Sequence, residues 1–249
     1  MQALETATVD DWPDPVELLN ADSPSELVLI CEHASNHIPA EYGGLGVSPS
    51  ELQRHIAWDV GAAAVTRGLA EALGCAAFLG TYSRLLVDLN RPYGSDTSRP
   101  IISEYTEIPG NRNLAPQELA HRRARIFDPF HNAVAAFLDR RAMAGTSVRI
   151  AAIHSFTPVY RGVARPWHVG ILYERPGGYP QRVMAALAQD PTLVVGENEP
   201  YTIDRESDYA IPVHGTDRGH PALLLEIRND LIADAAGARD WTTRLAAIL

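Results

Sequence analysis

Short apolar runs that alternate with helix-length segments constrain the fold of this chain more than any other feature. The runs are nearly continuous rather than interleaved with polar residues, which is the pattern of strands buried on both faces. They lie at residues 26–31, 75–79, 85–89, 149–154, 168–173, 193–196 and 222–226. Buried strands separated by helices predict an α/β sandwich with a mostly parallel sheet.

Helices and loops account for the remaining residues. We expect one helix from Ser48 to Leu73, ending at Gly74, and a longer one from Pro116 to about Met143 that can kink at Pro129. Residues 92–114 form a long loop, and loops of this length inside a compact domain tend to line binding sites. Residues 1–25 are predicted to be an N-terminal arm, and 26–249 a single domain without internal repeats.

Lysine is absent, so all 21 basic residues are arginines. This excludes a Walker A lysine, a Schiff-base lysine and a Ser-Lys dyad. The formal net charge of −10 argues against a protein that binds nucleic acid through its overall charge. Any cationic anchor for an anionic substrate must be an arginine, a protonated histidine or a metal, which draws attention to Arg84, Arg91, Arg218 and Arg228.

The two cysteines, Cys31 and Cys75, do not form a Cys-x-x-Cys pair, which excludes zinc ribbons, iron–sulfur clusters and thioredoxin-type sites. The N-terminal residues lack the pattern of a signal peptide, and no apolar run approaches the ~20 residues that span a bilayer. We therefore expect a cytoplasmic protein with no membrane or nucleic-acid partner; the sequence does not predict the oligomeric state.

Polar residues follow three of the predicted strands at the point where each strand ends. The first strand is followed by Glu32 and His33, the second ends in His154, and the third ends in Glu226. Ligands of such sheets bind at the carboxyl ends of strands, so we expect these side chains to converge. Two histidines and a carboxylate would hold a catalytic zinc or another divalent metal, and Glu226 would be the general base.

Each residue also has an ordinary structural interpretation. A histidine after a strand can simply hydrogen-bond to the backbone, and Glu226 can form an ion pair with an arginine. The segment containing Arg84, Asp88, Asn90 and Arg91 favours a substrate carboxylate, because the guanidinium fork binds carboxylates through two parallel hydrogen bonds. The alternative is that these charges form surface salt bridges, with Asp88 orienting an arginine or capping the following turn.

Six short motifs occur in an order that resembles the N-formylglutamate amidohydrolase family. Together they run over most of the chain. They are Cys31-Glu-His-Ala-Ser-Asn36 with Pro39, Ala57-Trp-Asp-Val-Gly61, Val87-Asp-Leu-Asn-Arg91, Ile153-His-Ser155, Asn198-Glu-Pro-Tyr201 and Leu225-Glu-Ile-Arg-Asn229.

The resemblance implies a three-layer α/β/α fold like that of zinc carboxypeptidases and aspartoacylase, with a mixed eight-stranded sheet between helices. It also implies metal-dependent hydrolysis of an N-acylated acidic amino acid to formate and glutamate. Carried over by position, His33 and His154 correspond to metal ligands, Glu226 to the general base, and Asn90-Arg91 to the pair that holds the substrate carboxylate.

One position departs from the aspartoacylase-type His-x-x-Glu pattern, because Asn36 stands where the second ligand is a glutamate. Another carboxylate must then complete a metal site. Asp59 is the first candidate, four residues after His55 on the predicted helix, and Glu32 is the second. Asp59 could equally orient a metal-bound histidine.

The sequence thus predicts a metal-dependent amidohydrolase of N-formyl or other N-acyl amino acids, with N-formyl-L-glutamate as the expected small-molecule substrate. Arg84 and Arg228 join Asn90 and Arg91 as candidate substrate-binding residues. Two alternatives stay open: an amidohydrolase or carboxypeptidase-like enzyme of the same fold with another N-acyl or peptide substrate, and a non-catalytic protein that binds carboxylate ligands.

Overall fold

The computed structural model describes residues 11–249. Within this range the helices are α1 (Ala62–Leu73), α2 (Pro116–Arg122), α3 (Asp128–Met143), α4 (Gly178–Leu187) and α5 (Ala235–Ala246). The strands are β1 (Val16–Leu19), β2 (Leu27–Cys31), β3 (Ala76–Gly80), β4 (Ile102–Ser103), β5 (Thr106–Glu107), β6 (Arg149–Phe156), β7 (Val159–Tyr160), β8 (Val163–Ala164), β9 (Val169–Leu172), β10 (Val195–Glu197) and β11 (Ala222–Arg228).

The central sheet is mixed and mostly parallel. Its strand order is β1-β3-β2-β6-β11-β9-β10. Four of the six strand pairs are parallel, whereas β1 runs antiparallel to β3, and β9 antiparallel to β11. The prediction of a mixed, mostly parallel sheet is confirmed. The expectation of eight strands is wrong for the described residues, in which the sheet has seven.

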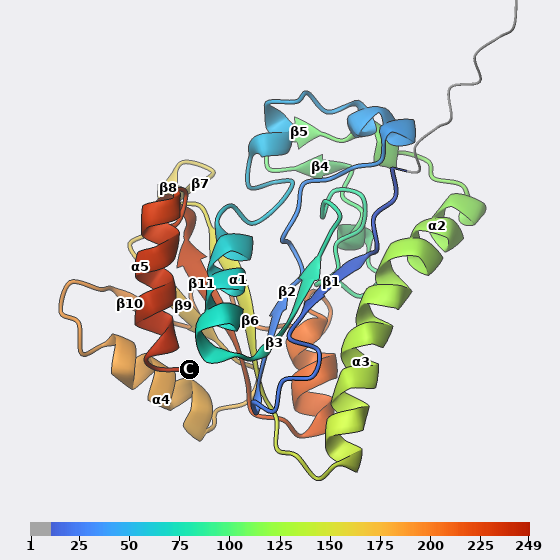
Figure 1. The fold of residues 1–249 in the computed structure, drawn as a ribbon. Helices are drawn as coiled ribbons and strands as arrows, with labels where there is room; N and C mark the ends of the chain where they lie inside the picture. The colour runs from blue at the N-terminus through green and yellow to red at the C-terminus, as the bar shows by residue number, and fades with distance from the viewer. Residues whose placement is uncertain (1–10) are drawn as a thin grey trace, which may run out of the picture.

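Helices cover both faces of the sheet, giving the three predicted layers (Figure 1). Because side chains alternate between faces along a strand, β2 contributes Leu27, Leu29 and Cys31 to a core shared with α1, α4 and α5. Its intervening residues, Val28 and Ile30, pack into the core beneath α3. Residues at the same alternate positions of β6 and β11, including His154 and Glu226, therefore face the α3 side of the sheet.

Four expectations for local structure need correction. The apolar run at 85–89 is not a strand: these residues form turns after β3, and their apolar side chains pack into the core beneath α3. The helix predicted from Ser48 begins only at Ala62, because residues 54–61 form turns and Gly61 has φ 83°. The helix at 116–143 contains a π-helical segment over 123–127, directly before Pro129, which has no N–H to donate to the preceding turn. Residues 16–19 of the expected arm form β1, which pairs with β3; residues 1–10 lie outside the described part.

Two small hairpins stand at the carboxyl edge of the parallel strands (Figure 1). The β4–β5 hairpin belongs to the long loop expected at 92–114, and the β7–β8 hairpin follows β6 directly. None of the helices over residues 11–249 combines the length and the apolar character needed to cross a membrane.

Gly170 in β9 lets the loop after β10 pass close over the sheet. It lies opposite Glu226 in the β9–β11 register, and a Cβ built there would be 1.7 Å from the carbonyl oxygen of Glu199. We expect Gly170→Ala to destabilise the protein by about 1–3 kcal/mol, because backbone must move to relieve the clash. Gly94→Ala is the control, since nothing lies within 4 Å of its Cβ position. Equal urea midpoints for the two variants would contradict this packing.

Candidate active site

A cleft of about 730 Å³ lies where the parallel strands end. His33, which follows β2, His154 in β6 and Glu226 in β11 all line it, and so do residues of the β4–β5 and β7–β8 hairpins. The predicted convergence of strand ends is therefore present. A second cavity, of about 640 Å³, lies at the opposite edge of the sheet and contains none of the candidate residues.

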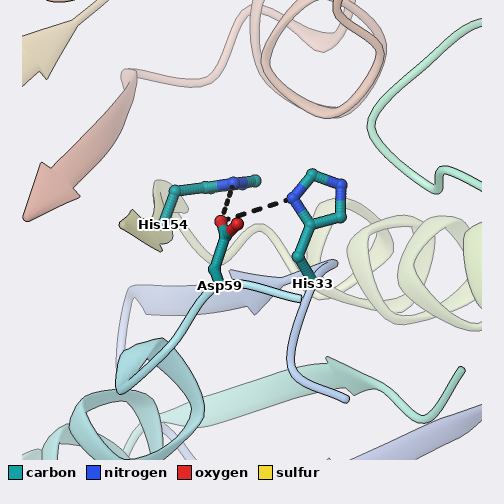
Figure 2. A group of neighbouring side chains, drawn as sticks. All are labelled: His33, Asp59 and His154. Atoms are coloured by element: carbon teal, nitrogen blue, oxygen red, sulfur yellow. Dashed lines mark hydrogen bonds and ion pairs between the residues drawn. The ribbon is translucent and has the colours of Figure 1, made fainter. Parts of the chain in front are cut away.

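His33, Asp59 and His154, all in the lining of this cleft, lie close together, with both imidazoles beside the Asp59 carboxylate (Figure 2). The Oδ2 atom of Asp59 lies 3.3 Å from Nδ1 of His33 and 2.9 Å from Nδ1 of His154. All three side chains are buried. Asp59 comes from the turn before α1, and its backbone N–H donates to the carbonyl of His33 at 2.9 Å. This backbone bond fixes the turn against the end of β2.

The second nitrogen of each histidine faces a different carboxylate. Nε2 of His33 lies 2.7 Å from Oδ1 of Asp88, and Nε2 of His154 lies 2.9 Å from Oε2 of Glu32. A carboxylate at Nε2 favours a proton there, so Nδ1, which contacts Asp59 in this structure, would be the nitrogen that donates an electron pair to a bound cation. Both Nδ1 atoms are thereby oriented toward the shared oxygen of Asp59.

The donor set fits a divalent cation. Two imidazole nitrogens and one carboxylate oxygen lie within 4.8 Å of one another. Two nitrogens and an oxygen are a donor combination common in catalytic zinc sites. In addition, the buried carboxylates of Glu32, Asp59 and Asp88 exceed what Arg84 can neutralise. A cation between the histidines would balance this charge.

The charges of these groups depend on one another. Burial raises the pKa of Asp59, but the charge of His33 and hydrogen bonds from both histidines outweigh it, so the pKa lies well below its usual range. For His154, burial lowers the pKa, while Glu32 and Asp59 together raise it well above the usual value. The protein thus holds anionic oxygens around a position that favours positive charge.

Glu226 adjoins this group without pairing with it. It lies beside His154 in the β6–β11 register and is buried, and its Oε2 atom has no hydrogen-bond partner among residues 11–249. Burial raises the pKa of this carboxyl to about 7, although the charge of His154 opposes the shift. A carboxyl with a pKa near neutrality is suited to accept and return a proton.

Arg84, Asn90 and Arg91 also line the cleft, as predicted, but each has protein partners. Arg84 donates from Nη1 to Asp59 at 3.1 Å, and from Nε and Nη2 to Oδ2 of Asp88 at 3.2 and 3.0 Å. The side-chain oxygen of Asn90 accepts backbone N–H groups of the 209–210 segment, and Arg91 donates to the carbonyl of Ser207. Arg84 therefore holds in place the two carboxylates that contact His33, those of Asp59 and Asp88.

Other sequence candidates lie elsewhere. Arg228 is absent from the cleft lining, because its guanidinium is held 2.8 Å from Asp230 just beyond the end of β11. Asn36 donates its amide N–H to the carbonyl of Leu52 at 2.8 Å and does not contact the histidines.

Arg218 pairs with Asp139 on α3, and His214 stacks in a buried pair with His131. Neither of the last two lines the cleft.

The structure adds positioning contacts that sequence reasoning missed or placed differently. Glu32 was a candidate ligand, but it lies on the far side of the His154 ring from Asp59. Asp88 contacts Arg84 and accepts the backbone N–H of Asn90, both as expected. Its contact with His33 was not expected.

Nδ1 of His55 lies 3.5 Å from Oδ1 of Asp59, but the two residues are joined by a turn and not by the predicted helix. Burial lowers the pKa of His55 to about 4, so this ring is neutral.

Comparison with known proteins gives the family and the fold of this chain. The family model for N-formylglutamate amidohydrolase matches residues 25–233. A crystal structure of a gene product from Agrobacterium tumefaciens is 36% identical, with a TM-score of 0.91 over 95% of this chain and 93% of that one. The structure of N-formylglutamate amidohydrolase from Ralstonia eutropha is 17% identical, with a TM-score of 0.72 over 95% and 96%, a likeness of fold.

No curated protein matches the chain. The family match nevertheless spans all six motifs that suggested the resemblance, and the solved relative at 36% identity covers nearly the whole chain. The resemblance is thus confirmed: the chain belongs to the N-formylglutamate amidohydrolase family and is a hydrolase that acts on amides.

Proposed function

We propose that this protein is a metal-dependent amidohydrolase that cleaves N-formyl-L-glutamate to formate and glutamate. The observation that carries the proposal is the convergence of His33, Asp59 and His154 beside the unpaired carboxyl of Glu226. Family membership supports the amide as the bond that is cleaved. The reaction adds one water across the amide: the hydroxyl goes to the formyl carbon, and a proton goes to the nitrogen.

His33, Asp59 and His154 are the residues that would hold the metal, with zinc as the first candidate. When bound, such an ion polarises a carbonyl and lowers the pKa of water. Asp88 and Glu32 set the direction of the two imidazoles through their Nε2 atoms. This arrangement supports metal binding because outer carboxylates orient ligating histidines and strengthen them as donors.

Glu226 moves the proton. Its carboxyl accepts a proton from the attacking water and returns it to the amide nitrogen, which leaves as the amine. The unpaired Oε2 atom supports this role, because no protein donor competes for it within residues 11–249. Arg91 and Asn90 both line the cleft and bind one carboxylate of the substrate. One N–H of the Asn90 amide donates to Asp208 at 3.2 Å, so the second N–H is the one that meets the substrate.

The size of the cleft favours one alternative, an N-acyl or peptide substrate larger than N-formylglutamate. Its volume of about 730 Å³ falls within the range of pockets that enclose ligands of drug size. We expect a panel of N-formyl, N-acetyl and N-succinyl amino acids to identify the preferred acyl group. The highest kcat/KM for the N-formyl series is the result expected from the proposed function.

Metal removal tests the proposal directly. We expect the protein treated with a chelator and then freed of it to lose turnover of N-formylglutamate, and zinc, cobalt or manganese to restore it. Elemental analysis should give close to one ion per chain in the active form. Full activity with no bound metal would contradict the metal assignment, and ligand binding without turnover under any metal would identify a non-catalytic binding protein.

A further inference from the structure

His55 lines the cleft beside the three converging donors but is not one of them. Its Nδ1 atom lies 3.5 Å from Oδ1 of Asp59, the carboxylate oxygen that Arg84 also contacts. His33 and His154 contact the other oxygen, Oδ2. The His55 ring therefore adjoins the donors from the side of Asp59 that faces away from their common point.

The turn that carries His55 is held in place on both sides of it. The guanidinium of Arg54 pairs with Glu104, in the loop between β4 and β5. The carbonyl of Ala57 accepts the hydroxyl of Ser83 at 2.8 Å, and its N–H donates to the carbonyl of Arg54 at 3.0 Å. Because these contacts fix the backbone on either side, the imidazole is positioned before a ligand arrives.

The two ring nitrogens of His55 differ in their access to the cleft. Nδ1 is buried against Asp59 without a hydrogen bond of normal geometry. Nε2 makes no hydrogen bond or ion pair within residues 11–249, and it is not one of the buried polar atoms that lack a partner. The exposed part of the ring, 15% of the side chain, therefore carries Nε2. Since His55 lines the cleft, this nitrogen is available to a ligand there.

The surroundings of the ring determine what Nε2 can bind. An imidazole carries one proton in its ordinary state at neutral pH, on one nitrogen or the other. The carboxylate of Asp59 favours that proton on Nδ1, the nitrogen that it faces. Nε2 then keeps its electron pair, so His55 presents a hydrogen-bond acceptor to the cleft.

A substrate such as N-formylglutamate has one group for this acceptor. At neutral pH its two carboxylates and its carbonyl oxygen accept hydrogen bonds, and the amide N–H is the donor. An N–H that is removed from water without an acceptor weakens binding. Glu226 also adjoins the donors with a free oxygen, but that oxygen must receive the proton of the attacking water. His55 is thus the acceptor that leaves the proposed base free.

We propose that Nε2 of His55 accepts a hydrogen bond from the N–H of the scissile amide, and that this contact makes the enzyme prefer amides to esters. The inference rests on the proposed function and deepens it, because it names the group that recognises the bond to be cleaved. His55 takes up no proton: Glu226 delivers the second hydrogen to the nitrogen, while the first stays on the nitrogen and faces His55.

The test compares N-formylglutamate with the formate ester of 2-hydroxyglutarate, in which an oxygen replaces the N–H. We expect His55→Asn to lower kcat/KM for the amide by roughly 3- to 10-fold, the range for one neutral hydrogen bond. For the ester, corrected for its uncatalysed hydrolysis, the change should stay below about 2-fold. His55→Gln can place an amide oxygen near the position of Nε2, so it should keep most of the preference for the amide.

The two variants also distinguish this role from a structural one. Asparagine can keep a polar group facing Asp59, whereas glutamine can reach the position of Nε2. Equal losses for amide and ester in His55→Asn would overturn the proposal, and so would a larger loss of amide preference in His55→Gln than in His55→Asn. His121→Asn, at an exposed position of α2, is the control for the chemical change and should alter neither rate.

A binding measurement separates this inference from the proposed function. If the wild type hydrolyses neither compound, the proposed function fails, and calorimetry with the same two compounds then decides the role of His55. The wild type should bind the amide roughly 3- to 10-fold more tightly than the ester, and His55→Asn should lose that difference. A wild type without a preference for the amide would overturn the assignment.

Discussion

Replacing His33 or His154 by alanine is expected to remove both the bound metal and the activity. Each variant deletes one of the three donors that face a common point beside Asp59. Loss of an outer partner alone typically weakens metal affinity by roughly 10- to 100-fold, so loss of a donor should exceed about 100-fold. Calorimetric titration of chelator-treated protein with zinc measures this, together with kcat/KM on N-formylglutamate.

A change at the outer partner of His33 should have an intermediate effect on metal binding. Asp88→Asn keeps the size of the side chain but removes the charge facing Nε2 of His33, so we expect metal affinity to fall by roughly 10- to 100-fold. His220→Ala removes a histidine that lies outside the cleft and should leave the stoichiometry at one ion. If His33→Ala and His154→Ala still bind one ion with wild-type affinity, the ligand assignment is wrong.

Glu226→Gln is expected to lower kcat by roughly 10²- to 10⁴-fold, the usual contribution of general acid–base catalysis. The amide has nearly the same shape but cannot take a proton from water. Because Glu226 is absent from the converging donors, metal binding should be unchanged. KM should change little, since the carboxyl acts in the transition state more than in binding.

Folding and metal content are measured alongside kcat, so that loss of the proton carrier is distinguished from loss of structure or of the ion. The circular dichroism spectrum and the urea midpoint of Glu226→Gln should match those of the wild type, and zinc titration should give one ion. Glu71→Gln makes the same chemical change at an exposed position of α1 and should retain full activity. A Glu226→Gln enzyme with near wild-type kcat would show that another group moves the proton.

The layered fold could be predicted from the sequence because each buried strand is marked by a short, continuous run of apolar residues. Strands such as β2 are buried at every position, and the polar residues that follow them mark the carboxyl edge of the sheet. The helix predicted from Ser48 was wrong because tertiary contacts prevail there: Asp59 donates its backbone N–H to His33, which requires a turn. The β1 strand is short, only partly buried and surrounded by prolines, so no run of apolar residues indicated it.

For the site, sequence reasoning named His33, Asp59 and His154, which the fold brings together, but it did not predict their contacts. From the sequence, either Asp59 or Glu32 could complete the donor set. The fold distinguishes them, because Asp59 contacts Nδ1 of His154, on the side of His33, whereas Glu32 contacts Nε2. The sequence alone could not exclude Arg228 from the substrate-binding residues. Its ion pair with Asp230, which holds the side chain away from the cleft, depends on where β11 ends.

The position of β11 in the sheet has a consequence for how the protein is made. Among the strands of the central sheet, β6 and β9 are consecutive in the chain, yet β11 lies between them and pairs with both. During synthesis the two parts of the sheet therefore stay apart, each with an unpaired edge, until residues 222–228 have left the ribosome. Because β11 also carries Glu226, the strand that closes the sheet brings the proposed base with it, and we expect fragments that end before residue 222 to be inactive.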